Sequence, residues 1–83
     1  MPTSLRVGPY RFFFYAGDRG EPVHTHVQRE SSEAKFWLEP IILAWNRGFS
    51  GAELRTLQKI VEENHNKLSA SWHDYFDDSS DES

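Results

Sequence analysis

Val23-His24-Thr25-His26-Val27-Gln28 alternates apolar or β-branched residues with two imidazoles and an amide. Successive side chains of a β-strand point to opposite faces of a sheet, so this period of two predicts a strand. Its odd-numbered residues would face a hydrophobic core. His24, His26 and Gln28 would share the opposite face, where we expect the chemistry of this chain to lie.

The segment Glu33–Glu39 follows after a short polar turn and shows the same alternation. Two such neighbouring segments favour an antiparallel hairpin. We expect its turn to be centred on Ser31-Ser32. This register places Gln28 opposite Lys35, His26 opposite Trp37 and His24 opposite Glu39.

Tyr10–Tyr15 is dense in β-favouring aromatic residues and predicts a strand that precedes the hairpin. The segment 16–22 contains two glycines and a proline, and would return the chain antiparallel to the histidine strand. The predicted register pairs Arg11 with Gln28, Phe13 with His26 and Tyr15 with His24. The histidine strand would therefore be central in the sheet.

A helix is predicted near the C-terminus, because Ser50 and Glu53 have the spacing of a capping box. Apolar residues then recur every three or four positions, which predicts one helix from about residue 51 to 75. Its apolar stripe consists of Leu54, Leu57, Ile60, Val61, Leu68, Trp72 and Tyr75. The preceding run Ile41–Trp45 suits a buried strand or a helical turn, with a strand favoured.

These elements predict an α+β fold, in which a three- or four-stranded antiparallel sheet carries one long C-terminal helix on one face. The 83 residues suit a single domain over 1–76, followed by an acidic tail at 77–83 that we expect to be disordered. The net charge is −4, and the tail holds four of the thirteen acidic residues. The remaining nine balance nine Lys and Arg, so the domain lacks the broad basic surface of a strong duplex-binding protein.

Cysteine does not occur in the sequence, which excludes disulfides and thiolate sites and fits a reducing compartment. No apolar run approaches the ~20 residues of a membrane span, and the N-terminus has no signal-peptide pattern. We therefore expect a cytoplasmic protein with no membrane partner.

The second face of the predicted sheet is too aromatic for an ordinary solvent surface. It carries Arg11, Phe13, Tyr15, His24, His26, Gln28, Lys35, Trp37 and Glu39. Tyr, Trp and Arg are enriched at protein interfaces, so this face is a candidate docking surface for a partner protein or a second copy. Alternatively, the segment 41–49 folds over this face and buries it.

Acid–base catalysis is a further hypothesis for this face. Cleavage of RNA beside a 2′-hydroxyl needs a base, an acid and a cation, and imidazoles titrate in the correct range. His24 and His26 would be the acid and base, with Lys35 or Arg11 as the cation. Glu39 would fix the tautomer of His24. The structural alternative is a pair of half-exposed imidazoles packed on aromatic rings.

His24, His26 and Glu39 also form a two-histidine, one-carboxylate set of the kind that holds iron or catalytic zinc. An H-x-H pair alone is poorly specific. We therefore predict no metal and no other cofactor.

Four segments of the chain resemble a short bacterial family known only as a domain of unknown function, of the DUF4160 type. They are Tyr10–Tyr15, Pro22–Val27, Ala34–Pro40 and Leu43–Ser50. The likeness covers about residues 1–76 and implies one component of a toxin–antitoxin-like pair whose small partner is encoded nearby. The recurrent motif residues of the family correspond to His24, His26, Lys35 and Trp37, and the resemblance assigns a catalytic role to none of them.

These observations lead to two functional hypotheses. The first is a component of a two-protein module, acting as an RNA-directed toxin and metal-independent ribonuclease. The alternative is a non-enzymatic interaction domain whose aromatic sheet face docks a partner or a second copy.

Overall fold

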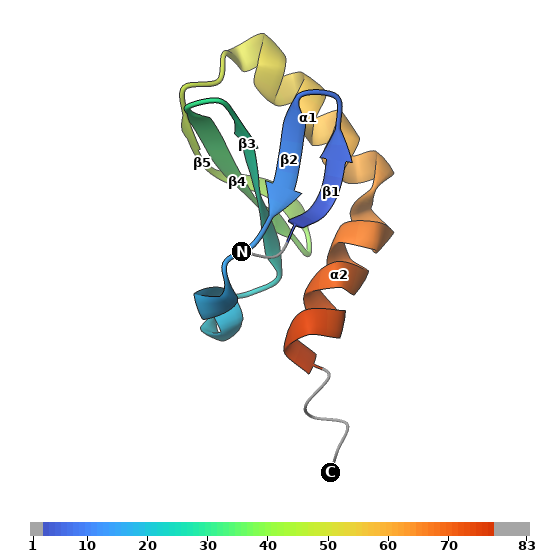
Figure 1. Cartoon of the computed structure of the whole chain (residues 1–83). Helices are drawn as coiled ribbons and strands as arrows, with labels where there is room; N and C mark the ends of the chain where they lie inside the picture. Colours follow the sequence, from blue (N-terminus) through green and yellow to red (C-terminus); the bar gives the residue numbers. More distant parts are fainter. Residues whose placement is uncertain (1–2, 78–83) are drawn as a thin grey trace.

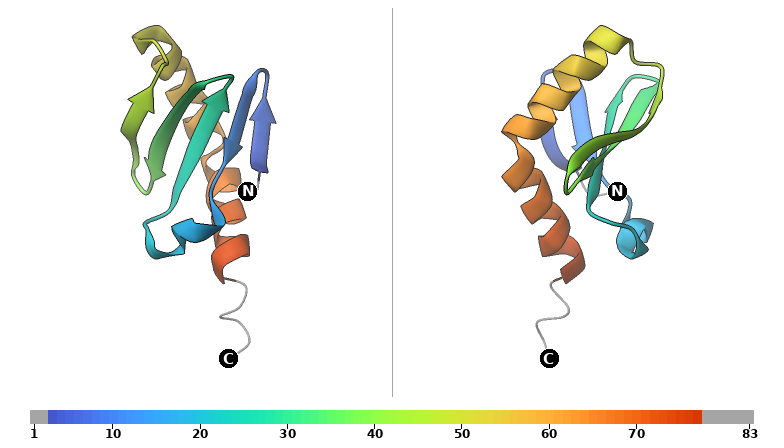
Figure 2. Two further views of the ribbon diagram at one scale, coloured as in Figure 1. Left: turned by 60° about the vertical axis from the view of Figure 1, so that its left-hand side comes forward. Right: turned by 180° about the vertical axis from the view of Figure 1, so that it is seen from behind.

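A computed structural model describes residues 3–77, except for the side chain of Asp77. Five strands precede two helices: β1 (Thr3–Val7), β2 (Tyr10–Phe13), β3 (His24–Arg29), β4 (Ser32–Leu38), β5 (Ile41–Arg47), α1 (Gly51–Glu63) and α2 (His65–Asp77). A short 3-10 helix, η1 (Ala16–Gly20), lies between β2 and β3. The strands form one antiparallel sheet in the order β1-β2-β3-β4-β5. Both helices lie on the same side of this sheet (Figures 1 and 2).

The α+β class is confirmed, but the predicted numbers of strands and helices are wrong. β1 was not expected, because Pro2, Gly8 and Pro9 read as chain breakers around a short segment. Gly8 instead adopts a positive φ of 57° in the tight turn that joins β1 to β2. The run Ile41–Trp45, for which a strand is favoured over a helical turn, is indeed a strand and forms most of β5.

The predicted single helix from 51 to 75 is interrupted at Asn64. This residue has φ −114° and ψ 21°, and its side-chain amide donates to the carbonyl of Ile60 at 2.9 Å. That bond occupies a carbonyl of the last turn of α1, as C-terminal capping residues do. The chain bends there, so that α1 and α2 follow different directions along the sheet (Figure 2).

The start of the first helix is predicted correctly. Ser50 accepts a hydrogen bond from the backbone N–H of Glu53 at 3.1 Å. The carboxylate of Glu53 does not complete the capping box, because it accepts from Arg29 at 2.8 and 3.0 Å and from Tyr10 at 2.9 Å. These bonds join the beginning of α1 to β2 and β3.

The pairing of β2 with β3 is confirmed, with Arg11 opposite Gln28 and Phe13 opposite His26. The predicted pairing of Tyr15 with His24 is wrong, because β2 ends at Phe13 and the chain turns into η1.

The predicted register of the β3–β4 hairpin is wrong by two residues. Glu30 has a positive φ of 55°, and the turn contains only Glu30 and Ser31 between the paired residues Arg29 and Ser32. The shorter turn moves every partner, since turn length fixes hairpin register. Trp37 lies opposite His24, Lys35 opposite His26 and Glu33 opposite Gln28. A shift of two preserves the faces but removes Glu39 from the position facing His24.

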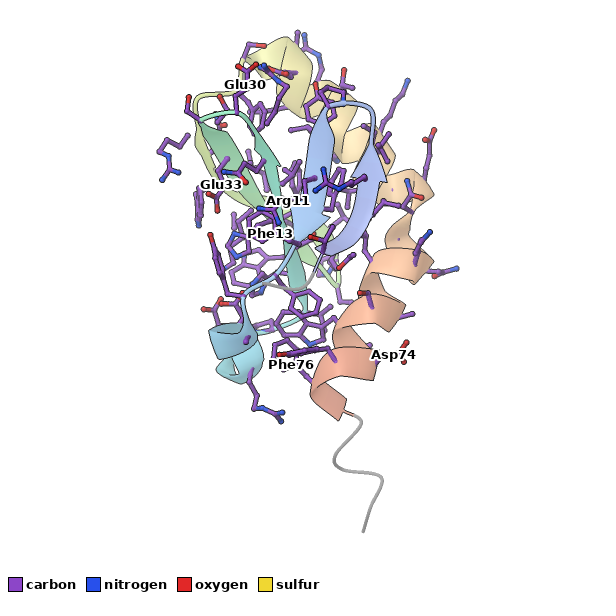
Figure 3. All side chains as sticks on the ribbon, in the orientation of Figure 1. Arg11, Phe13, Glu30, Glu33, Asp74 and Phe76 are labelled. Carbon is purple, nitrogen blue, oxygen red and sulfur yellow. The ribbon has the colours of Figure 1, made fainter. Side chains whose placement is uncertain are left out.

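The main core lies between the sheet and the helices. It contains Phe12, Val27, Ala34, Phe36, Leu38, Phe49, Leu57, Val61 and Leu68. A second cluster of Phe14, Trp72 and Phe76 packs the end of α2 against the chain after β2. Phe76 points into this cluster, whereas Asp74 on the same helix points away (Figure 3). Tyr75, expected in the apolar stripe, is 44% exposed.

Apart from Asp77, the predicted disordered tail lies outside the described residues. Within residues 3–77, no helix is both long and apolar enough to cross a membrane.

Candidate functional site: a buried acid–imidazole cluster

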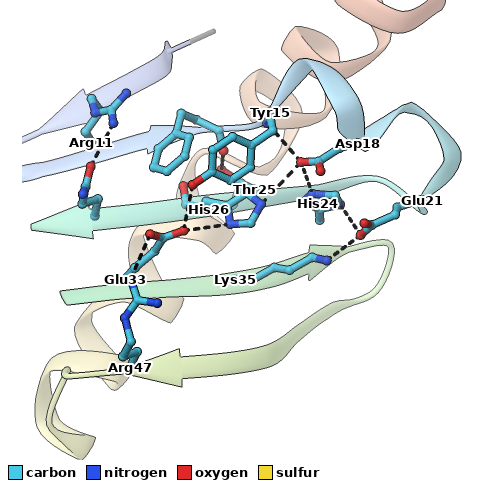
Figure 4. Close-up of polar contacts among 12 residues, drawn as sticks. Arg11, Tyr15, Asp18, Glu21, His24, Thr25, His26, Glu33, Lys35 and Arg47 are labelled. Atoms are coloured by element: carbon cyan, nitrogen blue, oxygen red, sulfur yellow. Dashed lines mark hydrogen bonds and ion pairs between the residues drawn. The ribbon is translucent and has the colours of Figure 1, made fainter. Parts of the chain in front are cut away.

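His24 and His26 project from β3 on the face opposite the main core, and η1 folds over the end of this face (Figure 4). Both residues are nearly inaccessible to solvent, with exposed fractions of 1% and 5%. The backbone of segment 41–49 does not fold over them, because β5 extends the sheet as its edge strand. The cover comes from Tyr15 and η1 on one side, and on the other from a single side chain of β5, the Trp45 ring.

Asp18 of η1 is the centre of the cluster. Its Oδ2 atom lies 2.8 Å from Nε2 of His24 and 3.4 Å from Nε2 of His26. The same oxygen accepts the backbone N–H of Tyr15 at 3.0 Å, which fixes the carboxylate at the start of η1. Burial alone would raise the pKa of Asp18, but the Tyr15 N–H and the two imidazoles outweigh it and hold the pKa below its usual range.

His24 has an acceptor at each ring nitrogen. Nδ1 lies 2.9 Å from the carbonyl oxygen of Pro22, and Nε2 faces the Asp18 carboxylate. Both neighbouring oxygens can accept a hydrogen bond from the ring nitrogen that faces them. The rings of Trp37 and Trp72 flank the imidazole at centroid distances of 5.6 and 4.7 Å.

His26 is placed differently. Its Nδ1 lies 3.3 Å from Oε2 of Glu33 and its Nε2 lies 3.4 Å from Asp18, yet neither nitrogen makes a hydrogen bond with any residue that the structure describes. Phe13 stacks on the ring at 5.3 Å and Tyr15 meets it edge-on at 4.7 Å. Burial, and after it the positive charge on His24, hold the pKa of His26 below its usual range.

Two acidic residues form an outer layer. Glu33 of β4 accepts from the Tyr15 hydroxyl at 3.4 Å and pairs with Arg47 at 3.4 Å. Glu21 accepts from Lys35 at 2.5 Å and lies 3.8 Å from Nδ1 of His24. The cluster is therefore enclosed by charged side chains that have partners of their own.

The structure gathers only some of the predicted site residues. Phe13, Tyr15, His24, His26 and Trp37 lie together. Lys35 is directed to Glu21 and lies 4.4 Å above the Trp37 ring. These contacts make the histidine pair part of an aromatic and ionic network.

Three of the predicted residues lie outside the cluster. Arg11 lies over Phe13 at 4.3 Å and donates to Gln28 at 2.9 Å, which leaves both on the neighbouring part of the face. Glu39 is not part of the cluster, since it lies in the β4–β5 turn and pairs with His73 at 3.7 Å.

Sequence reasoning missed Asp18 and Glu33, the two carboxylates beside the imidazoles. Asp18 precedes His24 by six residues in a segment that was read only as a loop. The signal that could have identified Asp18 is the shortness of this loop, which keeps its residues close to the start of the histidine strand. Glu33 was assigned to a strand, but the shifted register hid its position next to His26.

The fold and site define a small α+β protein whose five-stranded meander holds a buried cluster of one aspartate and two histidines. The chain belongs to the family described as Domain of unknown function (DUF4160), whose model matches residues 10–73. The matched region contains η1, β3 and β4, and with them every residue of the cluster. Neither the curated proteins nor the solved structures contain a match to this chain.

Proposed function

We propose that this domain is a protein-interaction module that docks a second polypeptide along the free edge of β5. The observation that carries the proposal is the apolar surface of this edge strand. Ile42, Leu43 and Trp45 are 53%, 37% and 39% exposed, although each is a large hydrophobic residue. Contiguous exposed groups of this kind mark interaction sites.

An edge strand presents backbone N–H and C=O groups that can pair with another strand. Proteins usually protect such edges with charged residues, proline or bulges. β5 spans seven residues and carries a single charge, Arg47, although its pairing with β4 has one irregularity near Ala44. The edge is therefore weakly protected over most of its length.

The occupant we propose is a second copy of the chain. Ile42 lies opposite Trp37 and Trp45 opposite Lys35, so both side chains are on the histidine face despite their spacing of three. A two-fold antiparallel pair of β5 strands centred between Leu43 and Ala44 places Ile42 of each copy opposite Trp45 of the other. Such self-complementary contacts suit a symmetric dimer, and apolar cross-strand pairs stabilise it.

The RNA-directed toxin suggested by the sequence has less support. A general acid or base must reach its substrate within hydrogen-bond distance. His24 and His26 are almost fully enclosed, and the proposed cation Lys35 is engaged by Glu21. The toxin–antitoxin role rests on the family resemblance, and a small partner encoded nearby would be a different occupant of the same edge.

The test compares the solution mass of the intact protein with that of two variants by light scattering after gel filtration. The wild type should have twice the 9.7 kDa mass of one chain. Ile42→Lys should be monomeric, because the interface would lose an apolar side chain and would have to take a charged ammonium out of water. Tyr75→Lys, which changes another exposed large hydrophobic residue on α2, should remain dimeric.

Circular dichroism establishes that both variants are folded. A wild type that stays at the mass of one chain at its highest attainable concentration would overturn the proposed dimer. If that monomer instead forms a heterodimer with the product of a neighbouring gene, the proposal that a second copy occupies the β5 edge is also overturned. A dimeric Ile42→Lys protein would show that the interface is elsewhere.

A further inference from the structure

We propose that Asp18, His24 and His26 form a binding site for a first-row transition-metal ion such as Zn²⁺. One ligand atom of each residue lies within 4.8 Å of those of the other two. Atoms bound tetrahedrally at ~2.0–2.1 Å from zinc lie about 3.3 Å apart. The observed distances of 2.8 and 3.4 Å from Asp18 Oδ2 to the two Nε2 atoms bracket that value.

The state of His26 is a second, independent observation that points to a ligand. The residue is 5% exposed, and its Nε2 is directed to Asp18 without making a hydrogen bond to any described residue. A buried polar atom that makes no hydrogen bond is unfavourable, and such atoms in native proteins call for an explanation. A metal ion between the two Nε2 atoms and Asp18 would bind the Nε2 lone pair and replace the missing hydrogen bond.

The outer contacts have the arrangement found around metal-binding histidines. Such histidines bind the ion with one nitrogen and direct the other N–H to a carbonyl or carboxylate. Nδ1 of His24 faces the Pro22 carbonyl at 2.9 Å, and Nδ1 of His26 faces Glu33 at 3.3 Å. Both rings therefore turn Nε2 toward Asp18, as Figure 4 shows.

The types of donor atom indicate the class of ion. Two imidazoles and one carboxylate suit Zn²⁺ and neighbouring transition metals better than Mg²⁺ or Ca²⁺, which favour oxygen ligands. Each Nε2 atom must offer its lone pair to the metal, so a proton on Nε2 would have to leave before the ion binds.

The position of the ligands in the fold indicates what the ion would do. Asp18 belongs to η1, whereas both histidines belong to β3. An ion bound to all three would join η1 to the central strand. The aromatic rings of Phe13, Tyr15 and Trp45 surround this position, so we assign the ion a structural role.

The test starts from the full chain after exhaustive chelation and uses Zn²⁺ alone as the probe. Isothermal titration calorimetry should show one ion per chain, and bound Zn²⁺ should raise the melting temperature. His26→Gln and Asp18→Asn each remove a ligand and should weaken binding more than Glu33→Gln does. Loss of an outer partner such as Glu33 typically lowers affinity about 10–100-fold.

His73→Gln is the matched control, since it removes an imidazole on α2 that contacts Glu39 rather than the cluster. It should bind Zn²⁺ as the wild type does. If the ligand variants fail to fold, the NMR signals of the histidine rings in the wild type still test the proposal. Zn²⁺ should shift the signals of His24 and His26, and not those of His65 and His73.

A wild type that takes up no Zn²⁺ would overturn the proposal. The cluster would then consist only of the direct contacts between Asp18 and the two imidazoles. Unchanged affinity in Asp18→Asn and His26→Gln would also overturn it, because the ion would then be bound elsewhere. Neither result bears on the proposed pairing at β5, which is measured by mass.

Discussion

Replacement of Trp72 by alanine tests how α2 is held against the sheet. Trp72 is 4% exposed and lies between Phe14 and Phe76, at centroid distances of 5.4 and 4.4 Å. Its indole also flanks the His24 ring at 4.7 Å. A single side chain therefore connects the C-terminal helix to both the second apolar cluster and the acid–imidazole cluster.

The expected loss of stability follows from this burial. Truncation of a buried tryptophan to alanine typically lowers the free energy of unfolding by about 3–5 kcal/mol. A domain of this size has a total of roughly 4–12 kcal/mol, from ~0.05–0.15 kcal/mol per residue. Each 1 kcal/mol lowers the melting temperature of a small domain by about 4–8 °C. We therefore expect Trp72→Ala to melt at least roughly 12 °C below the wild type.

Tyr75→Ala is the matched comparison, because Tyr75 contacts the same two phenylalanines from an exposed position. Its loss should lower stability by less than about 1 kcal/mol. Urea and thermal unfolding, both followed by far-ultraviolet circular dichroism, measure the two variants without relying on tryptophan fluorescence. Equal losses of unfolding free energy in the two variants would refute the docking of α2 through Trp72. If Trp72→Ala is unfolded, Trp72→Phe replaces it in the comparison.

Two other substitutions test local features of the fold. Gly48→Ala should lower stability by about 1–3 kcal/mol in thermal melts, because Gly48 has φ +101° and an added Cβ would lie 2.6 Å from Oγ of Ser32. Gly17→Ala is the control, since a Cβ added at Gly17 would meet no atom within 4 Å. Equal losses of stability in the two variants would contradict this conformation of Gly48. Hydrogen bonds from Arg29 and then from Tyr10 lower the pKa of Glu53 below its ordinary value of 4.5. The ionised carboxylate therefore stabilises the fold above that pH, and this stabilisation is lost as the pH falls through the folded-state pKa. The advantage of the wild type over Glu53→Gln in urea unfolding should be largest at neutral pH and disappear in acid, and an advantage independent of pH would contradict the ion pair.

The elements that follow from local residue patterns could be predicted from the sequence. Alternation correctly identified β3 and β4, and the aromatic run identified all of β2, which ends two residues before the predicted end. The Ser50 cap correctly gave the start of α1. These signals are local, because strand alternation and helix capping depend on residues within one element.

The errors arose where one residue changes the path of the backbone. The positive φ of Glu30 shortens the β3–β4 turn and shifts the whole hairpin by two residues. Asn64 ends α1 by bonding to the carbonyl of Ile60, although the apolar periodicity continues beyond it. Neither residue is glycine or proline, so the sequence pattern contained no strong breaker at either place.

The acid–imidazole cluster depends both on a local residue pattern and on the path of the backbone through the turns. The alternation placed His24 and His26 on one face, and that shared face is what the site needs. The identity of their carboxylate partner depends on how the backbone enters and leaves the strand. Once the hairpin register moves Glu39 away, the loop that precedes β3 is the segment that reaches the Nε2 atoms, and Asp18 is its inward carboxylate. A prediction of the partner from sequence would therefore have needed the geometry of two turns, whereas the histidine pair required only the period of a strand.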